Sequence, residues 1–82
     1  MMTEEEMLIQ LHEAETLLQE HGIEVVSSDY GVHYYFINIE LCNDYAFYKS
    51  SKDGKWYLFN NVLNSYTSGD LEELIVIWKS LY

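Results

Sequence analysis

Hydrophobic residues at helical spacing mark the first quarter of the chain. Four of them recur three or four positions apart and form one stripe: Met7, Leu11, Ala14 and Leu18. Thr3 and Glu6 have the spacing of a capping box, in which each side chain accepts a hydrogen bond from the other residue's backbone N–H. Gly22 favours termination, because glycine adopts the positive φ that the residue after a helix often requires. The pattern predicts an amphipathic helix over Thr3–His21.

A second helical stripe lies at the end of the sequence. Its apolar positions are Leu71, Leu74, Ile75, Trp78 and Leu81. Asp70 and Glu73 are spaced as another capping box, so Thr67–Asp70 is expected to open this helix. The core predicted from both stripes and from the strand between them comprises Leu11, Leu18, Ile37, Ile39, Leu71, Leu74 and Trp78.

Short runs rich in aromatic and β-branched residues separate the two stripes and are typical of strands. Ile23–Ser27 is predicted as a short strand, which Ser28–Gly31 turns back. Alternation in the strand Val32–Leu41 gives a core face with His33, Tyr35, Ile37, Ile39 and Leu41, and a second face with Val32, Tyr34, Phe36, Asn38 and Glu40. Asp53 and Gly54 predict a tight hairpin within 44–60, because glycine supplies the φ > 0 position of such a turn.

The stretch Asn60–Tyr66 fits either the end of a strand or a loop. The element order is then αββββα, or αβββα if the first strand is irregular, in a single domain over 1–82. We predict an α+β fold in which both helices pack on one face of an antiparallel sheet. The other face would expose aromatic rings or offer them to a partner.

Charge is distributed unevenly along the chain. Fourteen acidic residues face four lysines, for a formal net charge of −10. Ten acids and neither Lys nor Arg precede Lys49, and Glu6, Glu13 and Glu20 recur every seven residues on one side of the first predicted helix. Exposed helices usually mix signs, because Glu–Lys pairs stabilise them. A surface of this kind repels nucleic acid and attracts basic surfaces, although high net charge also serves solubility alone.

Candidate chemistry is sparse. His12 and Glu13 begin like a zinc-protease helix, but Thr16 stands where the second His is needed. The histidines lack ligand spacing, and the acids lack the pattern of a calcium loop. Cys42 follows His33 by nine residues without the local signature of a thiol nucleophile, so we expect it buried at a strand end. The sequence predicts no enzyme activity, no cofactor and no metal.

The terminal composition and the single cysteine bear on the compartment. One cysteine excludes an internal disulfide and fits a reducing environment. The N-terminus is acidic where a signal peptide must be basic, and no apolar run has transmembrane length. We expect a cytoplasmic protein, in the host cell's cytoplasm if a phage encodes it, without direct contact to membrane or nucleic acid.

Three features distinguish the chain as a whole. They are the base-free acidic helix, the acids scattered through the sheet region and the Tyr- and Asn-rich strands. In these it resembles the small acidic inhibitors of phages and mobile elements, such as DNA-mimic anti-CRISPR and anti-restriction proteins. The resemblance implies carboxylates that replace phosphates on the basic channel of a CRISPR or restriction nuclease, or of another DNA-binding protein. The candidate acidic surface comprises Glu5, Glu6, Glu13, Glu20, Glu24, Asp29, Glu40 and Asp44.

A second class of function would use the uncovered sheet face. A generic interaction module, or a homodimer, would bind through the rings of Tyr34, Phe36, Tyr48 and Tyr57, with the acids serving solubility. A small enzyme is a third class, which the missing motifs disfavour. Salt separates the first two classes, because it screens charge pairs and hardly affects apolar contacts. Monomer and homodimer both fit the sequence.

Overall fold

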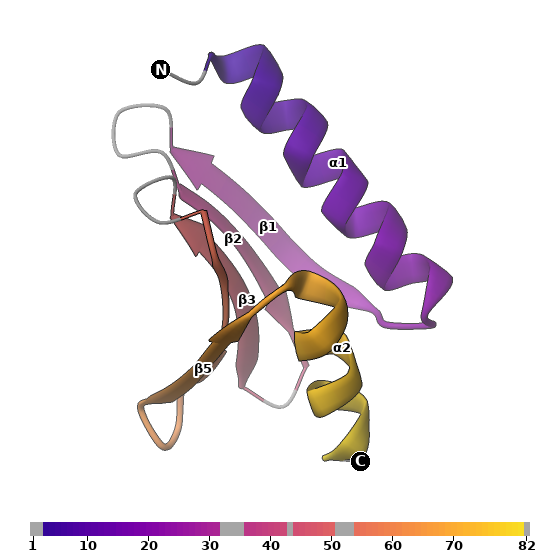
Figure 1. Cartoon of the computed structure of the whole chain (residues 1–82), viewed down its shortest axis with the longest axis vertical. Coiled ribbons are helices and arrows are strands. Elements are labelled where there is room, and N and C mark those ends of the chain that lie inside the picture. Colours follow the sequence, from indigo (N-terminus) through magenta and orange to yellow (C-terminus); the bar gives the residue numbers. More distant parts are fainter. Residues whose placement is uncertain (1–2, 32–35, 43, 51–53, 82) are drawn as a thin grey trace.

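The computed structural model describes residues 3–31, 36–42, 44–50 and 54–81. Its elements are α1 (Glu4–Glu20), β1 (Val25–Gly31), β2 (Phe36–Leu41), β3 (Tyr45–Ser50), β4 (Trp56–Asn60), β5 (Ser65–Gly69) and α2 (Leu71–Ser80). The strands form one antiparallel sheet in the order β1-β2-β3-β4-β5 (Figure 1). Both helices pack on the same face, with α1 against β1 and α2 against β4 and β5. The predicted α+β class is confirmed.

The sheet has one strand more than the four predicted. β5 occupies Ser65–Gly69, which includes residues expected to open the second helix. As an edge strand it pairs with β4 alone among the described strands, and its residues are small or exposed. It therefore lacks the apolar alternation that identifies a buried strand. α2 begins after Asp70, whose side chain makes no capping hydrogen bond, so the second capping box is wrong.

β1 is longer than predicted, and the turn expected at Ser28–Gly31 is wrong. These four residues continue β1 and pair with β2. Residues 32–35 connect β1 to β2 and lie outside the described residues, as do the faces predicted for Val32, His33, Tyr34 and Tyr35. Asp53 of the predicted hairpin turn also lies outside them, whereas Gly54 has the expected positive φ of 68°.

α1 is capped by the two residues predicted as its ends, with Thr3 as N-cap and His21 as C-cap. The Glu6 N–H donates to Thr3 Oγ1 at 3.2 Å, as one half of a capping box does. Gly22 has φ 72°, and its N–H donates to the Gln19 carbonyl. The Ile23 N–H donates to the Leu18 carbonyl at 2.9 Å, which completes a Schellman motif. The buried Ile23 side chain then directs the chain from α1 back to the sheet.

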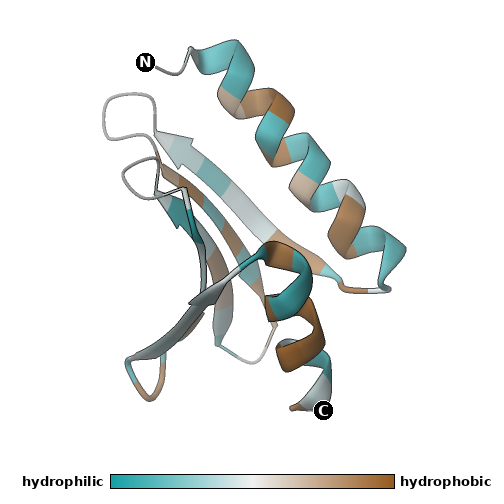
Figure 2. Cartoon of the chain, viewed as in Figure 1, coloured by the Kyte–Doolittle hydropathy of each residue, from teal (hydrophilic) through white to brown (hydrophobic). Residues whose placement is uncertain are grey.

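The core lies between the helices and the covered face of the sheet, and Figure 2 shows hydrophobic segments on both helices and on the strands. Ile37, Ile39 and Phe47 belong to it and are at most 2% exposed. The residues that α1 and α2 bury against them are Met7, Leu11, Ala14, Leu18, Leu74 and Ile75. Leu71 and Trp78 pack at the margin and are partly buried. Leu81 is 52% exposed, contrary to its predicted place on the apolar stripe, because α2 ends before it.

Candidate protein-binding surfaces

The structure exposes all eight acids of the candidate acidic surface but divides them between different faces. Those exposed residues are Glu5, Glu6, Glu13, Glu20, Glu24, Asp29, Glu40 and Asp44. The first four lie on α1, Glu24 follows it, and Asp44 lies in the connection between β2 and β3. Asp29 and Glu40 belong to β1 and β2, and only the strand register decides which way they point.

Asp29 and Glu40 face away from both helices. Ile37 and Ile39 are buried under the helices, so the alternate residues of β2 point to the uncovered face. Glu40 is one of these residues, and the Ser27 hydroxyl donates to its Oε2 at 3.3 Å. Asp29 pairs with Asn38 on the same side. The sheet therefore separates these two carboxylates from those of α1.

Glu6, Glu13 and Glu20 form a line along α1, which we term the acidic row. Seven residues of helix rise by about 10.5 Å, so the row spans about 21 Å. Within the described residues, their carboxylates make no hydrogen bond or ion pair. They therefore remain available to a partner. The carboxylate of Glu4, in contrast, accepts a hydrogen bond from the Tyr30 hydroxyl of the same chain at 2.9 Å.

The contact between Tyr30 and Glu4 ties the first turn of α1 to β1. The hydrogen bond to Glu4 raises the pKa of Tyr30 above its ordinary value of 10, and desolvation and the negative charges of Glu4 and Asp29 act in the same direction. A raised pKa favours the neutral phenol in the folded chain. The contribution of this contact to stability is therefore fully present below pH 10 and is lost only as the pH rises through the higher folded value.

A shallow groove follows the outer side of α1. It is lined by Ile9, His12, Glu13, Thr16, Leu17 and Glu20. Ile9 is 51% exposed, and two carboxylates of the acidic row flank this apolar surface. A partner with an apolar side chain between basic residues would complement both its shape and its charge.

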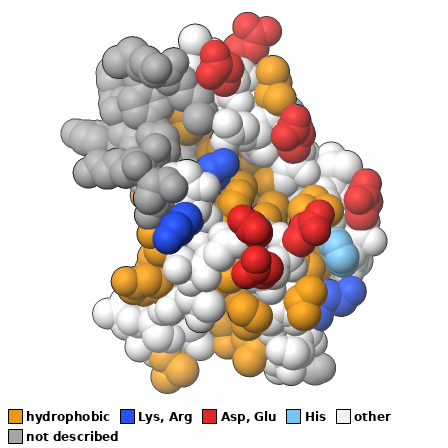
Figure 3. All heavy atoms as spheres, viewed as in Figure 1, with side chains coloured by type: hydrophobic (Ala, Val, Ile, Leu, Met, Phe, Trp, Pro, Cys, Tyr) orange, Lys and Arg blue, Asp and Glu red, His pale blue; other side chains and the backbone are white. Residues whose placement is uncertain are grey.

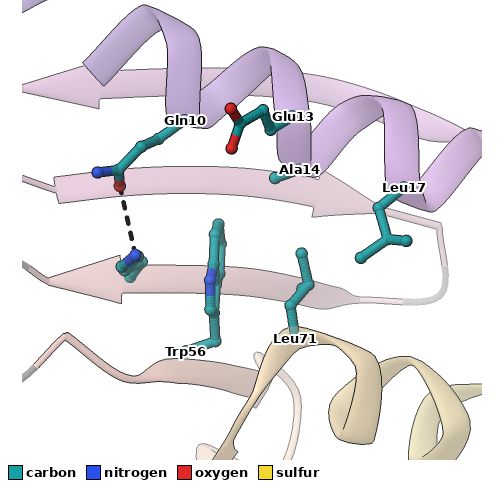
Figure 4. Close-up of a pocket in the computed structure, with 7 residues that line it drawn as sticks. Gln10, Glu13, Ala14, Leu17, Trp56 and Leu71 are labelled. Carbon is teal, nitrogen blue, oxygen red and sulfur yellow. Dashed lines mark hydrogen bonds between the residues drawn. The ribbon is translucent and has the colours of Figure 1, made fainter. Parts of the chain in front are cut away.

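A smaller pocket of about 180 Å³ lies between α1 and the start of α2 (Figure 4). Trp56 on β4 lies beside Leu71 of α2, and Glu13 projects from α1 above them. Lys49 Nζ donates to Gln10 Oε1 at 3.3 Å and lies 5.6 Å from the centroid of the Trp56 ring. Lys49 on β3 therefore links α1 to the sheet. Figure 3 shows acidic side chains around the apolar area of this face.

The uncovered face carries five rings that we term the aromatic cluster: Phe36, Tyr48, Tyr57, Phe59 and Tyr66. Their centroids are 5.5 to 6.3 Å apart in five pairs that cross from β2 to β5. Gly31 makes room at one end, because a Cβ atom there would collide with the Phe36 ring. Four rings are half-buried, and Tyr66 is 63% exposed. The face is therefore apolar at its centre and open to a partner.

Sequence reasoning identified part of this cluster. Phe36, Tyr48 and Tyr57 lie together as predicted, and Tyr34 lies outside the described residues. Phe59 was missed as a candidate although it alternates with Tyr57 along the same strand and its ring contacts that of Tyr48. Tyr66 was missed because β5 was not recognised, and its pairing with Phe59 follows only from the register.

Cys42 and the possible metal ligands are the remaining candidate groups of the sequence. Cys42 is exposed at the end of β2, contrary to its expected burial. In the part of the chain that the structure describes, no three His, Cys, Asp or Glu side chains gather around a possible metal position. None of the described helices is both long and apolar enough to span a bilayer. Comparison with protein-family models, with curated proteins and with solved structures finds no match for the chain.

Proposed function

We propose that this chain is a non-enzymatic binding protein that occupies the basic nucleic-acid-binding surface of another protein. The acidic row carries this proposal: three exposed carboxylates without an internal partner among the described residues, on a helix of 17 residues that lacks Lys and Arg. A CRISPR or restriction nuclease, inhibited in this way, is the partner class that the charge and the resemblance favour. Its Arg and Lys side chains bind phosphates and would pair with carboxylates by the same charge-assisted hydrogen bonds.

The free energy of exposed charge pairs shows why the acidic row needs additional contacts to bind a partner. Exposed charge pairs contribute about 0.2–1 kcal/mol each, so three pairs supply at most about 3 kcal/mol. Glu5 and Glu24 extend the negative surface along and beyond α1. The groove beside Ile9 offers apolar area, and burial there would add about 25 cal/mol per Å². We infer that the carboxylates select the partner and speed association, while the groove prolongs the complex.

The salt dependence of binding tests this proposal. The tagged chain would capture proteins from a lysate of its source cells at low salt, and mass spectrometry would identify them. With the purified partner, we expect the Kd to rise at least ten-fold between about 50 and about 200 mM salt, because exposed charge pairs are screened over this range. A Kd that stays constant over this range would count against electrostatic docking.

A second candidate function uses the aromatic cluster. The observation that favours it is the continuous set of partly exposed rings on a sheet face that no described helix covers. Tyr57→Ser combined with Tyr66→Ser would then weaken partner binding at least ten-fold at any salt concentration, because apolar area is lost. Under the first proposal the same double variant binds the partner as wild type does. The pair of outcomes distinguishes the two surfaces.

A further inference from the structure

Among the described strands, β5 forms an edge of the sheet and has no Lys, Pro or register shift of its own. It pairs only with β4 in the described sheet, so part of its backbone N–H and C=O groups point away from the sheet. Natural edge strands are usually protected by Lys, Pro, bulges or a covering element. β5 has the sequence Ser-Tyr-Thr-Ser-Gly, and its first four residues are exposed. Its edge is therefore competent to pair with another strand.

The opposite edge of the sheet is protected. β1 shifts register between Val25 and Ser27, which disturbs the regular ladder. Asp29 adds a charge, and its Oδ1 accepts a hydrogen bond from the Tyr30 N–H at 2.8 Å. β5 has neither a register shift nor a charged residue. Self-pairing is therefore expected at β5.

Exposed apolar side chains lie on β5 and in the turn before it. Tyr66 extends the aromatic cluster to β5 on the uncovered face. Val62 and Leu63, in the turn before β5, are 69% and 72% exposed. Exposed apolar residues at an open strand edge are typical of an interface.

We propose that two copies of the chain pair antiparallel through β5 and join their sheets into one. This proposal does not depend on the acidic row. Antiparallel pairing about a two-fold axis presents the same residues on both sides, as in an isologous dimer. Ser and Thr side chains on the two strands would meet and form cross-strand hydrogen bonds. Tyr66 of each copy would lie within reach of the other ring, which would connect the two aromatic clusters.

Charge favours the antiparallel direction for a pair of this kind. Asp70, Glu72 and Glu73 lie at the C-terminal end of β5, where Glu73 Oε2 is 3.1 Å from the position of a Cβ on Gly69. A parallel pair would place both acidic ends side by side. An antiparallel pair places each acidic end beside the uncharged Ser65 end of the other copy and so avoids repulsion between like charges. A basic peptide strand would instead gain from that acidic end, and its binding would respond to salt.

Sedimentation equilibrium from about 1 µM to about 1 mM tests the proposal. Wild type is expected to form more dimer as its concentration rises. Thr67→Lys and Leu63→Glu should each weaken dimerisation at least ten-fold, because each places a charge in the interface. The matched controls are Ser28→Lys on the β1 edge and Ile9→Glu on α1, which should dimerise as wild type does. All four positions are exposed, so the circular dichroism spectra should not change.

A wild-type chain that stays monomeric throughout would overturn the proposal, and so would controls that weaken the dimer as much as the β5 variants. A dimer that Tyr48→Ser abolishes and Thr67→Lys leaves intact would place the interface on the aromatic cluster instead.

Disulfide trapping tests the geometry directly. In a Cys42→Ser background, single cysteines would be introduced as Tyr66→Cys, Thr67→Cys or Ser68→Cys. Opposite residues of antiparallel strands have Cα atoms about 4.5–5.5 Å apart, which permits a disulfide. At least one of the three variants should form a covalent dimer under mild oxidation, whereas Ser28→Cys should not. A dimer in solution that none of the three variants traps would contradict pairing through β5.

Discussion

Replacing Phe47 by Ala is expected to destabilise the chain by about 3–5 kcal/mol. Phe47 lies on the central strand β3, is 0% exposed and contacts the core that both helices cover. A domain of this size has a free energy of unfolding of about 4–12 kcal/mol. The variant should therefore lose much of its stability and should unfold at far lower urea concentration than wild type, as followed by circular dichroism.

Phe59→Ala is the matched control for this prediction. Phe59 is a residue of the same type on the neighbouring strand, but it faces the uncovered side and is half-buried. Its truncation removes ring contacts of about 0.5–1.5 kcal/mol together with part of its buried area, so its destabilisation should be clearly smaller. Equal losses for the two variants would mean that the two sheet faces are not differently covered.

The helices could be predicted because their signals are local. The spacing of Met7, Leu11 and Leu18 defines a stripe, and Thr3 and Gly22 mark its ends through hydrogen bonds made within a few residues. The edge strands could not be predicted in the same way. Ser28–Gly31 and Ser65–Gly69 contain turn-forming residues, yet both become strands because a neighbouring strand supplies hydrogen bonds. Tertiary pairing overrides local preference there.

The candidate surfaces, too, could be predicted where the signal is local and not where it depends on pairing between strands. Exposure of the α1 acids follows from helical periodicity, so the acidic row is visible in the sequence. The separation of Asp29 and Glu40 from that row depends on the pairing of β1 with β2, which no short-range pattern reveals. Tyr66 joins the aromatic cluster only through its pairing with Phe59. The sequence gives the chemical character of each side chain, but it does not predict which residues lie beside it on the neighbouring strands.

Reversal of the acidic row is expected to have the largest effect on function. Glu6→Lys, Glu13→Lys and Glu20→Lys together replace three attractive contacts by repulsive ones and change the net charge by six units. A loss of about 3 kcal/mol corresponds to roughly 100-fold weaker binding, and repulsion adds to it. The fold should survive, because all three side chains are exposed. Glu6→Lys is unfavourable for the helix dipole at the start of α1, whereas Glu20→Lys is favourable near its C-terminus. The two effects on helix stability therefore offset each other.

The matched control carries the same change of net charge on other faces: Asp29→Lys, Glu40→Lys and Glu72→Lys. Two of these residues lie on the uncovered sheet face, and the third lies on α2. The control should keep partner binding within a few-fold of wild type, because net charge acts over longer distances and is screened by salt. A similar loss in both triple variants would attribute binding to overall charge and not to the acidic row.

The central claim is that the acidic row occupies a nucleic-acid-binding site, and displacement of duplex DNA from the captured partner tests it most directly. The partner would be loaded with a fluorescent duplex, and the chain would be titrated while fluorescence anisotropy is followed. Wild type and the control variant should release the duplex completely, and the acidic-row variant should require roughly 100-fold more protein to do so. Release by the acidic-row variant at wild-type concentrations, or a complex that holds chain and duplex together, would contradict the claim.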